Sequence, residues 1–159
     1  MELDVDPIRD IYNHYVLTST CTFDIEPRPP EPPEVWLSQH PASYPAIVAC
    51  DGDKVVGWAT LSPHRTRCAY QNTVESSVYI HRDQHRRGIG RQLMKDLVQR
   101  AATLGHHTIL AGIADHQQAS LRLHEALGFT SVGCLREVGY KFGRWIDVDW
   151  MQLLFWRES

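Results

Sequence analysis

The sequence predicts an α/β domain in which helices cover both faces of a mixed β-sheet. Segments with the alternation typical of strands and segments with helical spacing of apolar residues follow one another along the chain. The length of 159 residues fits one domain, and 43% apolar with 22% charged residues is ordinary for a globular protein. A glycine-containing turn at residues 85–90, between a strand and a helix, is a connection of the kind that binds phosphate groups in such folds.

The first third of the chain predicts one long helix and a proline-rich loop. Residues 1–5 have the pattern of a short strand, and Asp6 then reads as an N-cap with Pro7 in the first helical position. The apolar residues at helical spacing are Ile8, Ile11, Tyr12 and Tyr15. Prolines exclude a regular helix or a central strand over residues 26–33, and a short helix is expected over residues 34–39.

The middle of the chain predicts three strands. Residues 46–50 and 54–61 are joined by residues 51–53, whose Asp-Gly pair indicates a tight hairpin turn. Residues 63–71 are polar and irregular. Residues 73–80 alternate between two faces and form the third strand.

The second half predicts two helices and three further strands. A helix over residues 91–104 would bury one apolar face and end at Gly105, because glycine readily terminates a helix. That face comprises Leu93, Met94, Leu97, Val98 and Ala101. The remaining elements are a strand over residues 108–113, a helix over residues 120–127, and two strands over residues 129–138 and 148–155 connected by residues 139–145.

Composition and cysteine spacing argue against several functions. A net charge of −3 gives no reason to expect a nucleic-acid partner. Cys21, Cys50, Cys68 and Cys134 form no CxxC pair, so we expect neither a metal centre nor a disulfide framework, and a reducing cytoplasmic compartment fits them. The N-terminus lacks the apolar core of a signal peptide, and no apolar run reaches the ~20 residues that span a bilayer, so we expect no membrane partner.

The turn at residues 85–90 carries the strongest functional signal. Between His81 and Arg91, four arginines outnumber the single acid, Asp83, in a chain that is negative overall. Glycines let a ligand approach the backbone, and unpaired N–H groups at the helix start attract negative charge. A phosphorylated cofactor fits this pattern, although a solvated turn without a ligand would look similar.

Several short motifs occur in a fixed order along nearly the whole chain. They are residues 13–15, 18–20, Phe23 with residues 26–27, residues 73–76 and 78–79, the turn at residues 85–90, and residues 123–129, 139–141, 143–145 and 147–148. With this combination the chain resembles the GNAT superfamily of acetyl-CoA-dependent N-acetyltransferases, and within it the phosphinothricin and methionine sulfoximine (or sulfone) acetyltransferase branch. The resemblance implies a mostly antiparallel sheet that is splayed at the cofactor site. His85 departs from the usual Gln or Arg of the turn, and Gln117 from a frequent Asn.

The resemblance implies acetyl-CoA as cosubstrate and no metal. Backbone groups of residues 86–91 would bind the pyrophosphate of coenzyme A, and Val78 and Ile80 would pair with the pantetheine arm as an added strand does. The implied cofactor contacts are Val78, Tyr79, Ile80, Arg86, Arg87, Gly88, Ile89, Gly90, Arg91, Gln117 and Ser120.

Acetyl transfer to an amine needs a base, because an α-amino group is mostly protonated at pH 7. The resemblance implies that Glu75 is this base, whereas its sequence context alone also fits a solvated or salt-bridged glutamate. It further implies that His124 assists the departing thiolate, either as an acid or in a relay with Glu75. Without the resemblance, His124 reads as a histidine satisfied by a neighbour on a helix face.

The implied acceptor is the α-amino group of a small amino acid such as phosphinothricin, methionine sulfoximine or methionine sulfone. Arg65 and Arg67 would bind its anionic groups, because arginine makes bidentate contacts, and Tyr70 and Phe23 would lie near it. Without the resemblance, the two arginines are ordinary surface charges.

Two further points follow from the resemblance. His64 and Asn72 stand where relatives often carry tryptophan, which predicts a more polar pocket wall. A homodimer is expected, with residues 141–145 as a lid or a dimer contact. The alternative functions are acetyl transfer to another small amine or a peptide, and a non-catalytic acyl-CoA-binding module.

Overall fold

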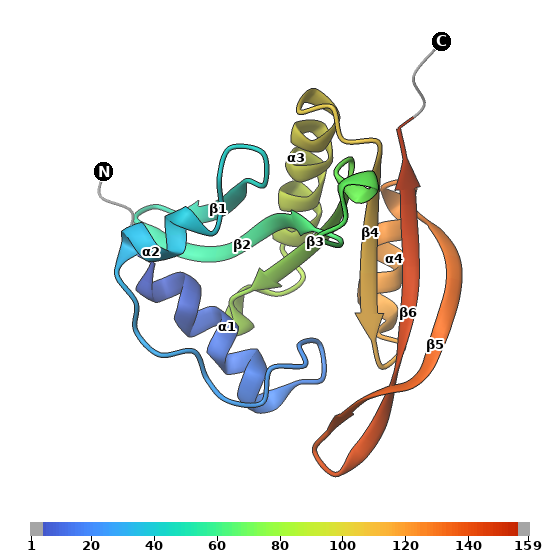
Figure 1. The fold of residues 1–159 in the computed structure, drawn as a ribbon. Coiled ribbons are helices and arrows are strands. Elements are labelled where there is room, and N and C mark those ends of the chain that lie inside the picture. The colour runs from blue at the N-terminus through green and yellow to red at the C-terminus, as the bar shows by residue number, and fades with distance from the viewer. Residues whose placement is uncertain (1–4, 156–159) are drawn as a thin grey trace.

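A six-stranded mixed sheet forms the centre of the molecule, with strand order β1-β2-β3-β4-β6-β5 (Figure 1). The computed structural model describes residues 5–155. The strands are β1 (Ala46–Asp51), β2 (Lys54–Pro63), β3 (Thr73–Ile80), β4 (Thr108–Ala114), β5 (Thr130–Lys141) and β6 (Arg144–Leu154). Neighbouring strands are antiparallel except for β3 and β4, which are parallel. The predicted mixed, mostly antiparallel sheet is therefore confirmed.

Helices cover both faces of this sheet (Figure 1). They are α1 (Asp6–Thr18), α2 (Pro33–Ser38), α3 (Ile89–Thr103) and α4 (Gln118–Ala126), and short 3-10 turns span Cys68–Tyr70 and Arg82–Gln84. Two apolar cores result, one with α1 and α2 and the other with α3 and α4. Strand β3 serves both, because Val78 and Ile80 pack on the α3 side and Tyr79 packs on the α1 side. Within residues 5–155, no helix is long and apolar enough to cross a membrane.

The sheet divides between β3 and β4. Their pairing extends from Thr73 and Thr108 to Glu75 and Leu110, whereas β3 stays paired with β2 as far as Ile80. Beyond these pairs the two strands diverge (Figure 1). We call residues 76–90 the β3 arm and residues 111–117 the β4 arm. The expected splay of the sheet is present at this point.

Two boundaries at the N-terminus differ from the predictions. The predicted strand at residues 1–5 lies, apart from Val5, outside the described residues. Asp6 is the first helical residue of α1 rather than its cap, since the amide of Arg9 donates to the Val5 carbonyl. The Asp6 carboxylate pairs with the Arg9 side chain at 2.6 Å instead of capping. The ion pair with Arg9, one turn further along the helix, therefore takes the place of the predicted cap.

The prediction of a connection over residues 139–145 was wrong. Strands β5 and β6 continue through this segment and meet in a turn at Phe142 and Gly143. Both turn residues have positive φ, 50° and 73°. Consecutive left-handed residues form the tight turn that matches the twist of a hairpin, here with phenylalanine in place of the usual asparagine or aspartate.

Candidate functional site

A cleft of about 670 Å³ lies between the two arms. Pairing of β3 with β4 ends at Glu75 and Leu110, and the residues that line the cleft begin at Ser76 and Ala111. The splay of the strands therefore produces the cleft. The predicted site residues that line it are Val78, Tyr79, Ile80, Arg86, Gly88, Ile89, Gly90, Arg91, Gln117, Ser120 and His124.

Arg87 is the one predicted cofactor residue that points elsewhere. Its guanidinium donates to Asp51 on the β1–β2 hairpin at 3.2 Å and also to Gln84. The side chain of Arg87 thus ties the turn to the neighbouring hairpin, and only its backbone belongs to the turn itself.

The start of α3 has the conformation of an anion-binding turn. Arg86 and Gly88 have left-handed φ values of 63° and 76°. Gly88 is the N-cap residue of α3, and none of the described side chains caps this helix. A Cβ atom on Gly88 would meet nothing within 4 Å. The N–H groups of the first turn are therefore accessible from the cleft, which is the arrangement that backbone recognition of phosphate requires.

The unusual His85 has a structural partner in α1. Its Nε2 lies 2.8 Å from the hydroxyl of Tyr15, which also donates to the Ile80 carbonyl. Burial raises the pKa of Tyr15 to about 12, so the hydroxyl stays protonated and can donate. Tyr15 and Cys21 both line the cleft, and the sequence analysis missed them. From the sequence, Tyr15 is expected as an apolar residue of its helix and as part of the motif at residues 13–15, with no role at the cofactor site.

Glu75 lies at the fork of the two arms and forms a pair with His64 on the adjoining strand end. The His64 Nδ1 to Glu75 Oε1 distance is 2.6 Å, and the two side chains are 16% and 33% exposed. The Arg65 Nε donates to His64 Nε2 at 3.4 Å, so Nδ1 is the nitrogen that donates to Glu75. His64 therefore orients the carboxylate beside the cleft. The sequence analysis predicted only that His64 makes the wall more polar.

His124 lies in the opposite wall of the cleft, on α4. Its Nδ1 donates to the Ser120 carbonyl at 2.7 Å, and its ring packs edge-on against Phe129. Burial lowers the pKa of His124, so the neutral form with an unprotonated Nε2 predominates at pH 7. In this state Nε2 has no proton to donate and can only accept one.

The predicted acceptor residues fall into two groups. Arg65 and Tyr70 gather around His64, with the Tyr70 ring centroid 5.4 Å from that of His64, and Arg67 precedes the 3-10 turn that carries Tyr70. Phe23 packs instead against β5, where a Cβ atom on Gly139 would overlap its ring. The structure thus brings Arg65 and Tyr70 together with Glu75 through His64.

Comparison with known proteins assigns the family. A family model described as an acetyltransferase (GNAT) domain matches residues 1–150. The chain belongs to the GNAT acetyltransferases. This confirms the resemblance inferred from the sequence motifs.

Individual GNAT proteins match over most of the chain. The phosphinothricin N-acetyltransferase of Streptomyces coelicolor is 44% identical over 156 residues, which is 96% of this chain and 91% of that protein. The L-methionine sulfoximine/L-methionine sulfone acetyltransferase of Salmonella typhimurium is 36% identical, covering 94% of this chain and 88% of its own length. A Salmonella typhimurium acetyltransferase solved with its cofactor acetyl-CoA superposes with a TM-score of 0.90 at 35% identity, over 96% of this chain and 88% of that one.

This GNAT protein is therefore an N-acetyltransferase, and its cosubstrate is acetyl-CoA. The cleft fits that molecule on structural grounds. The uncapped turn at Gly88 can receive a pyrophosphate, and the edge of β3 beyond Glu75, which β4 leaves, can pair with an extended pantetheine arm.

Proposed function

We propose that this acetyltransferase moves the acetyl group of acetyl-CoA directly to the α-amino group of a small amino acid, with Glu75 as general base. Phosphinothricin, methionine sulfoximine and methionine sulfone are the proposed acceptors. The observation that carries the proposal is the position of Glu75 at the fork, where the cleft begins and where His64 holds its carboxylate at 2.6 Å.

The proposed chemistry assigns one proton to Glu75. When bound, acetyl-CoA supplies a thioester, whose C–S bond breaks as the amine nitrogen bonds to the acetyl carbon. The amine must lose a proton, and we assign Glu75 Oε2 to take it, because His64 occupies Oε1. His64 is then a positioning residue, since it acts through Glu75.

For His124 we propose a relay role in place of a simple acid. In this relay, the proton that Glu75 took from the amine passes to Nε2 of His124, which is unprotonated in the neutral ring, and from there to the departing thiolate. A relay role is consistent with a neutral ring, because His124 does not have to carry a proton on Nε2 before the reaction begins. Glu75 and His124 come from β3 and α4, on opposite walls.

The acceptor class rests on the basic loop before β3 and on the relatives. Arg65 donates to His64, the partner of Glu75, and Arg67 lies two residues further along the same loop. The Tyr70 ring packs edge-on against His64. Such residues suit a zwitterionic amino acid whose side chain carries a polar, oxygen-bearing group. The Streptomyces coelicolor and Salmonella typhimurium relatives are named for such acceptors.

We further propose a homodimer that uses the β5–β6 hairpin. Strand β5 is an edge strand, and the hairpin exposes large apolar side chains, including Trp145 at 61% exposure. The others are Val132, Leu135, Val138, Tyr140, Phe142 and Leu154. Apolar groups gathered on a sheet edge are typical of an association surface. Sedimentation should show a dimer that Trp145→Glu weakens; a wild-type monomer at micromolar concentration would contradict this.

A cytoplasmic location stays part of the proposal. All four cysteines are unpaired, and three of them are exposed. Exposed thiols persist in a reducing compartment.

The experiment that tests the acceptor class measures coenzyme A thiol release with a panel of amines. The panel contains phosphinothricin, methionine sulfoximine, methionine sulfone, common amino acids, polyamines and a lysine peptide. We expect turnover with the first three above all others. Selective turnover of polyamines or the peptide would overturn the acceptor proposal, and binding of acetyl-CoA without turnover of any amine would favour a non-catalytic module.

A further inference from the structure

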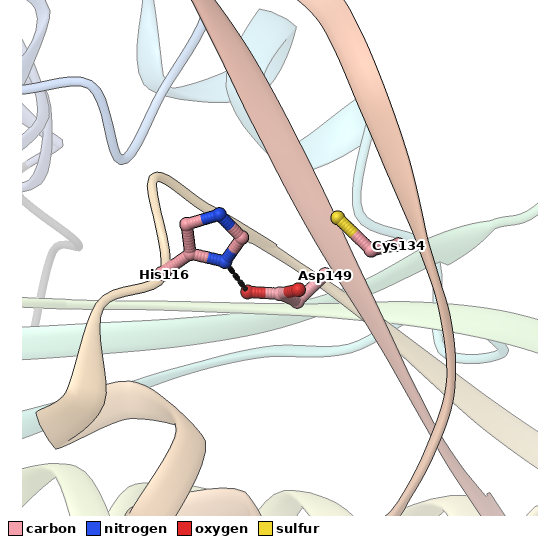
Figure 2. A group of neighbouring side chains, drawn as sticks. All are labelled: His116, Cys134 and Asp149. Atoms are coloured by element: carbon pink, nitrogen blue, oxygen red, sulfur yellow. Dashed lines mark hydrogen bonds and ion pairs between the residues drawn. The ribbon is translucent and has the colours of Figure 1, made fainter.

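A cluster of metal-ligating side chains lies at the end of the β4 arm, outside the wall of the cofactor cleft. It comprises His116 on the turn after β4, Cys134 on β5 and Asp149 on β6 (Figure 2). Cys134 and Asp149 are direct cross-strand partners, so their side chains share a face of the sheet. One nitrogen, one sulfur and one carboxylate oxygen, one from each residue, lie within 4.8 Å of one another.

We propose that these three residues form a binding site for a zinc ion. Zinc accepts imidazole nitrogen, thiolate sulfur and carboxylate oxygen together, whereas magnesium and calcium take oxygen ligands alone. In a tetrahedral zinc site, the bond lengths place nitrogen and oxygen ligand atoms about 3.3 Å apart and sulfur about 3.6 Å from each of them. The His116 Nδ1 to Asp149 Oδ2 distance is 2.7 Å, so the two side chains need only separate slightly to admit the ion.

Residues around His116 hold its ring in the way that residues around metal-ligating histidines usually do. Its other nitrogen, Nε2, lies 3.3 Å from Asp147 Oδ2, and Asp147 Oδ1 accepts the amide of Glu137 at 2.8 Å. In metal sites, a ligating histidine usually donates its second N–H to a carboxylate, which fixes the ring and its tautomer. Nδ1 donates its proton to Asp149 Oδ2 at 2.7 Å, and a zinc ion bound at Nδ1 would replace this proton while Nε2–H stays donated to Asp147.

The backbone holds His116 in this position at a conformational cost. Asp115 and His116 have φ values of 60° and 51°, a region that residues other than glycine seldom occupy. The guanidinium of Arg144 clamps Asp115 with two hydrogen bonds. Strained residues persist where their surroundings fix them, and here the strain aims the imidazole across the sheet.

The site is open to solvent and separate from acetyl transfer. The His116 side chain is 54% exposed and Cys134 is exposed, so a fourth position is available to water. Neither residue lines the cofactor cleft, whereas the next residue, Gln117, does. A zinc ion would therefore fix the turn that presents Gln117 without taking part in the reaction.

Cobalt(II) provides the most direct test, because a cobalt–thiolate bond gives a charge-transfer absorption that oxygen and nitrogen ligands do not. The reduced full-length protein is titrated with cobalt, and zinc is then added to displace it. We expect the charge-transfer band at one equivalent and its loss with zinc. Cys134→Ser should abolish the band, and the matched variants Cys50→Ser and Cys68→Ser, at two other exposed cysteines, should retain it.

A second variant tests the geometry separately from the thiol. Asp147→Asn keeps all three ligands and should keep the band, with zinc affinity about 10–100-fold weaker. Circular dichroism of each variant confirms that it is folded. Absence of the band in the wild-type protein, or its persistence in folded Cys134→Ser, overturns the proposal, and unchanged affinity in Asp147→Asn overturns the role of Asp147.

Discussion

The two arms of the split sheet end in turns that both contain left-handed residues and differ in how their side chains are used. Each turn joins a strand to a helix beside the cleft, and each contains left-handed residues: Arg86 and Gly88 on the β3 arm, Asp115 and His116 on the β4 arm. None of the described side chains caps the helix that follows either turn. On the β3 arm, Gly88 has no side chain, whereas on the β4 arm the side chains of Asp115 and His116 are engaged by partners on β6.

This difference separates binding from stability. In a turn with left-handed residues, successive backbone N–H groups point toward one side and form a concave site for an anion. In a folded protein this site can be occupied by a ligand or by side chains of the protein itself. On the β3 arm this site is open to an anionic ligand, whereas on the β4 arm the side chains form ion pairs within the protein. Substitutions in the β3 arm should therefore affect turnover and cofactor affinity, and those around the β4 turn should affect stability.

The largest expected effect is at the root of the β3 arm. Glu75→Gln keeps the hydrogen bond from His64 but removes the base, so turnover should fall on the order of 10²-fold or more. Acetyl-CoA affinity should stay near the wild-type value, because Glu75 does not line the cleft. Steady-state kinetics and direct binding measure the two quantities. Glu34→Gln, at an exposed glutamate on α2, is the control; wild-type turnover in Glu75→Gln would remove Glu75 from the mechanism.

The second effect tests the open space at Gly88. Asparagine tolerates the left-handed conformation, so Gly88→Asn should fold while its side chain enters the cleft. We expect acetyl-CoA affinity to fall at least about tenfold, equivalent to ~1.4 kcal/mol. Gly52→Asn is a matched control, since Gly52 has φ of 60°, has equally open space and lies outside the cleft. If calorimetric titration gives equal acetyl-CoA affinities for the two variants, the proposed role of the turn is wrong.

The third effect concerns the wall of the cleft formed by α4. Because the pKa of His124 is lowered in the folded protein, the unfolded chain binds more protons just below the usual histidine pKa of about 6.5. The free energy of unfolding should therefore fall as pH decreases through this range. His124→Gln should flatten this dependence in urea unfolding at pH 5–8. The remaining slope comes from His40, whose pKa burial also lowers, and, with the opposite sign, from His116, whose pKa Asp149 and Asp147 raise. An unchanged slope would show that His124 is protonated equally in both states.

The smallest effect tests the occupied space of the β4 arm. Arg144→Ala removes the clamp on Asp115, and the melting temperature should fall by about 1–3 °C, because exposed ion pairs contribute little. Acetyl-CoA affinity should change less than in Gly88→Asn. Arg136→Ala, an exposed arginine on β5, is the control. If the free energy of acetyl-CoA binding falls by more than the free energy of unfolding, the distinction between the two arms is wrong.

Local sequence predicted the β3 arm well. Alternation identified the strand over Thr73–Ile80, and the glycines with their arginines identified the turn, because both signals lie within a few consecutive residues. The predicted cofactor residues line one cleft, apart from Arg87. The start of α3 was placed two residues late, at 91, because the turn glycines mask the helical pattern.

The remaining features depend on contacts between distant residues. His64 and Glu75 meet only because β2 and β3 pair, and His116 and Asp149 meet across 33 positions of the chain. Neither pair has a spacing that a motif could encode, and cysteine spacing likewise gives no sign of Cys134 beside Asp149. The β5–β6 turn was missed because Phe142 adopts a conformation for which its residue type has no preference.

The seam between β3 and β4 has a consequence for local opening of the sheet. On one side of it lie β1, β2 and β3, on the other β4, β5 and β6, and each trio is contiguous in sequence. The seam has three residue pairs, fewer than any other strand pairing of this sheet, so we expect local opening to be more frequent there than within either half. A cosubstrate that touches both arms binds the joined form alone and stabilises it by mass action. Amide hydrogen exchange at residues 73–75 and 108–110 should slow on adding acetyl-CoA, more than exchange within either half.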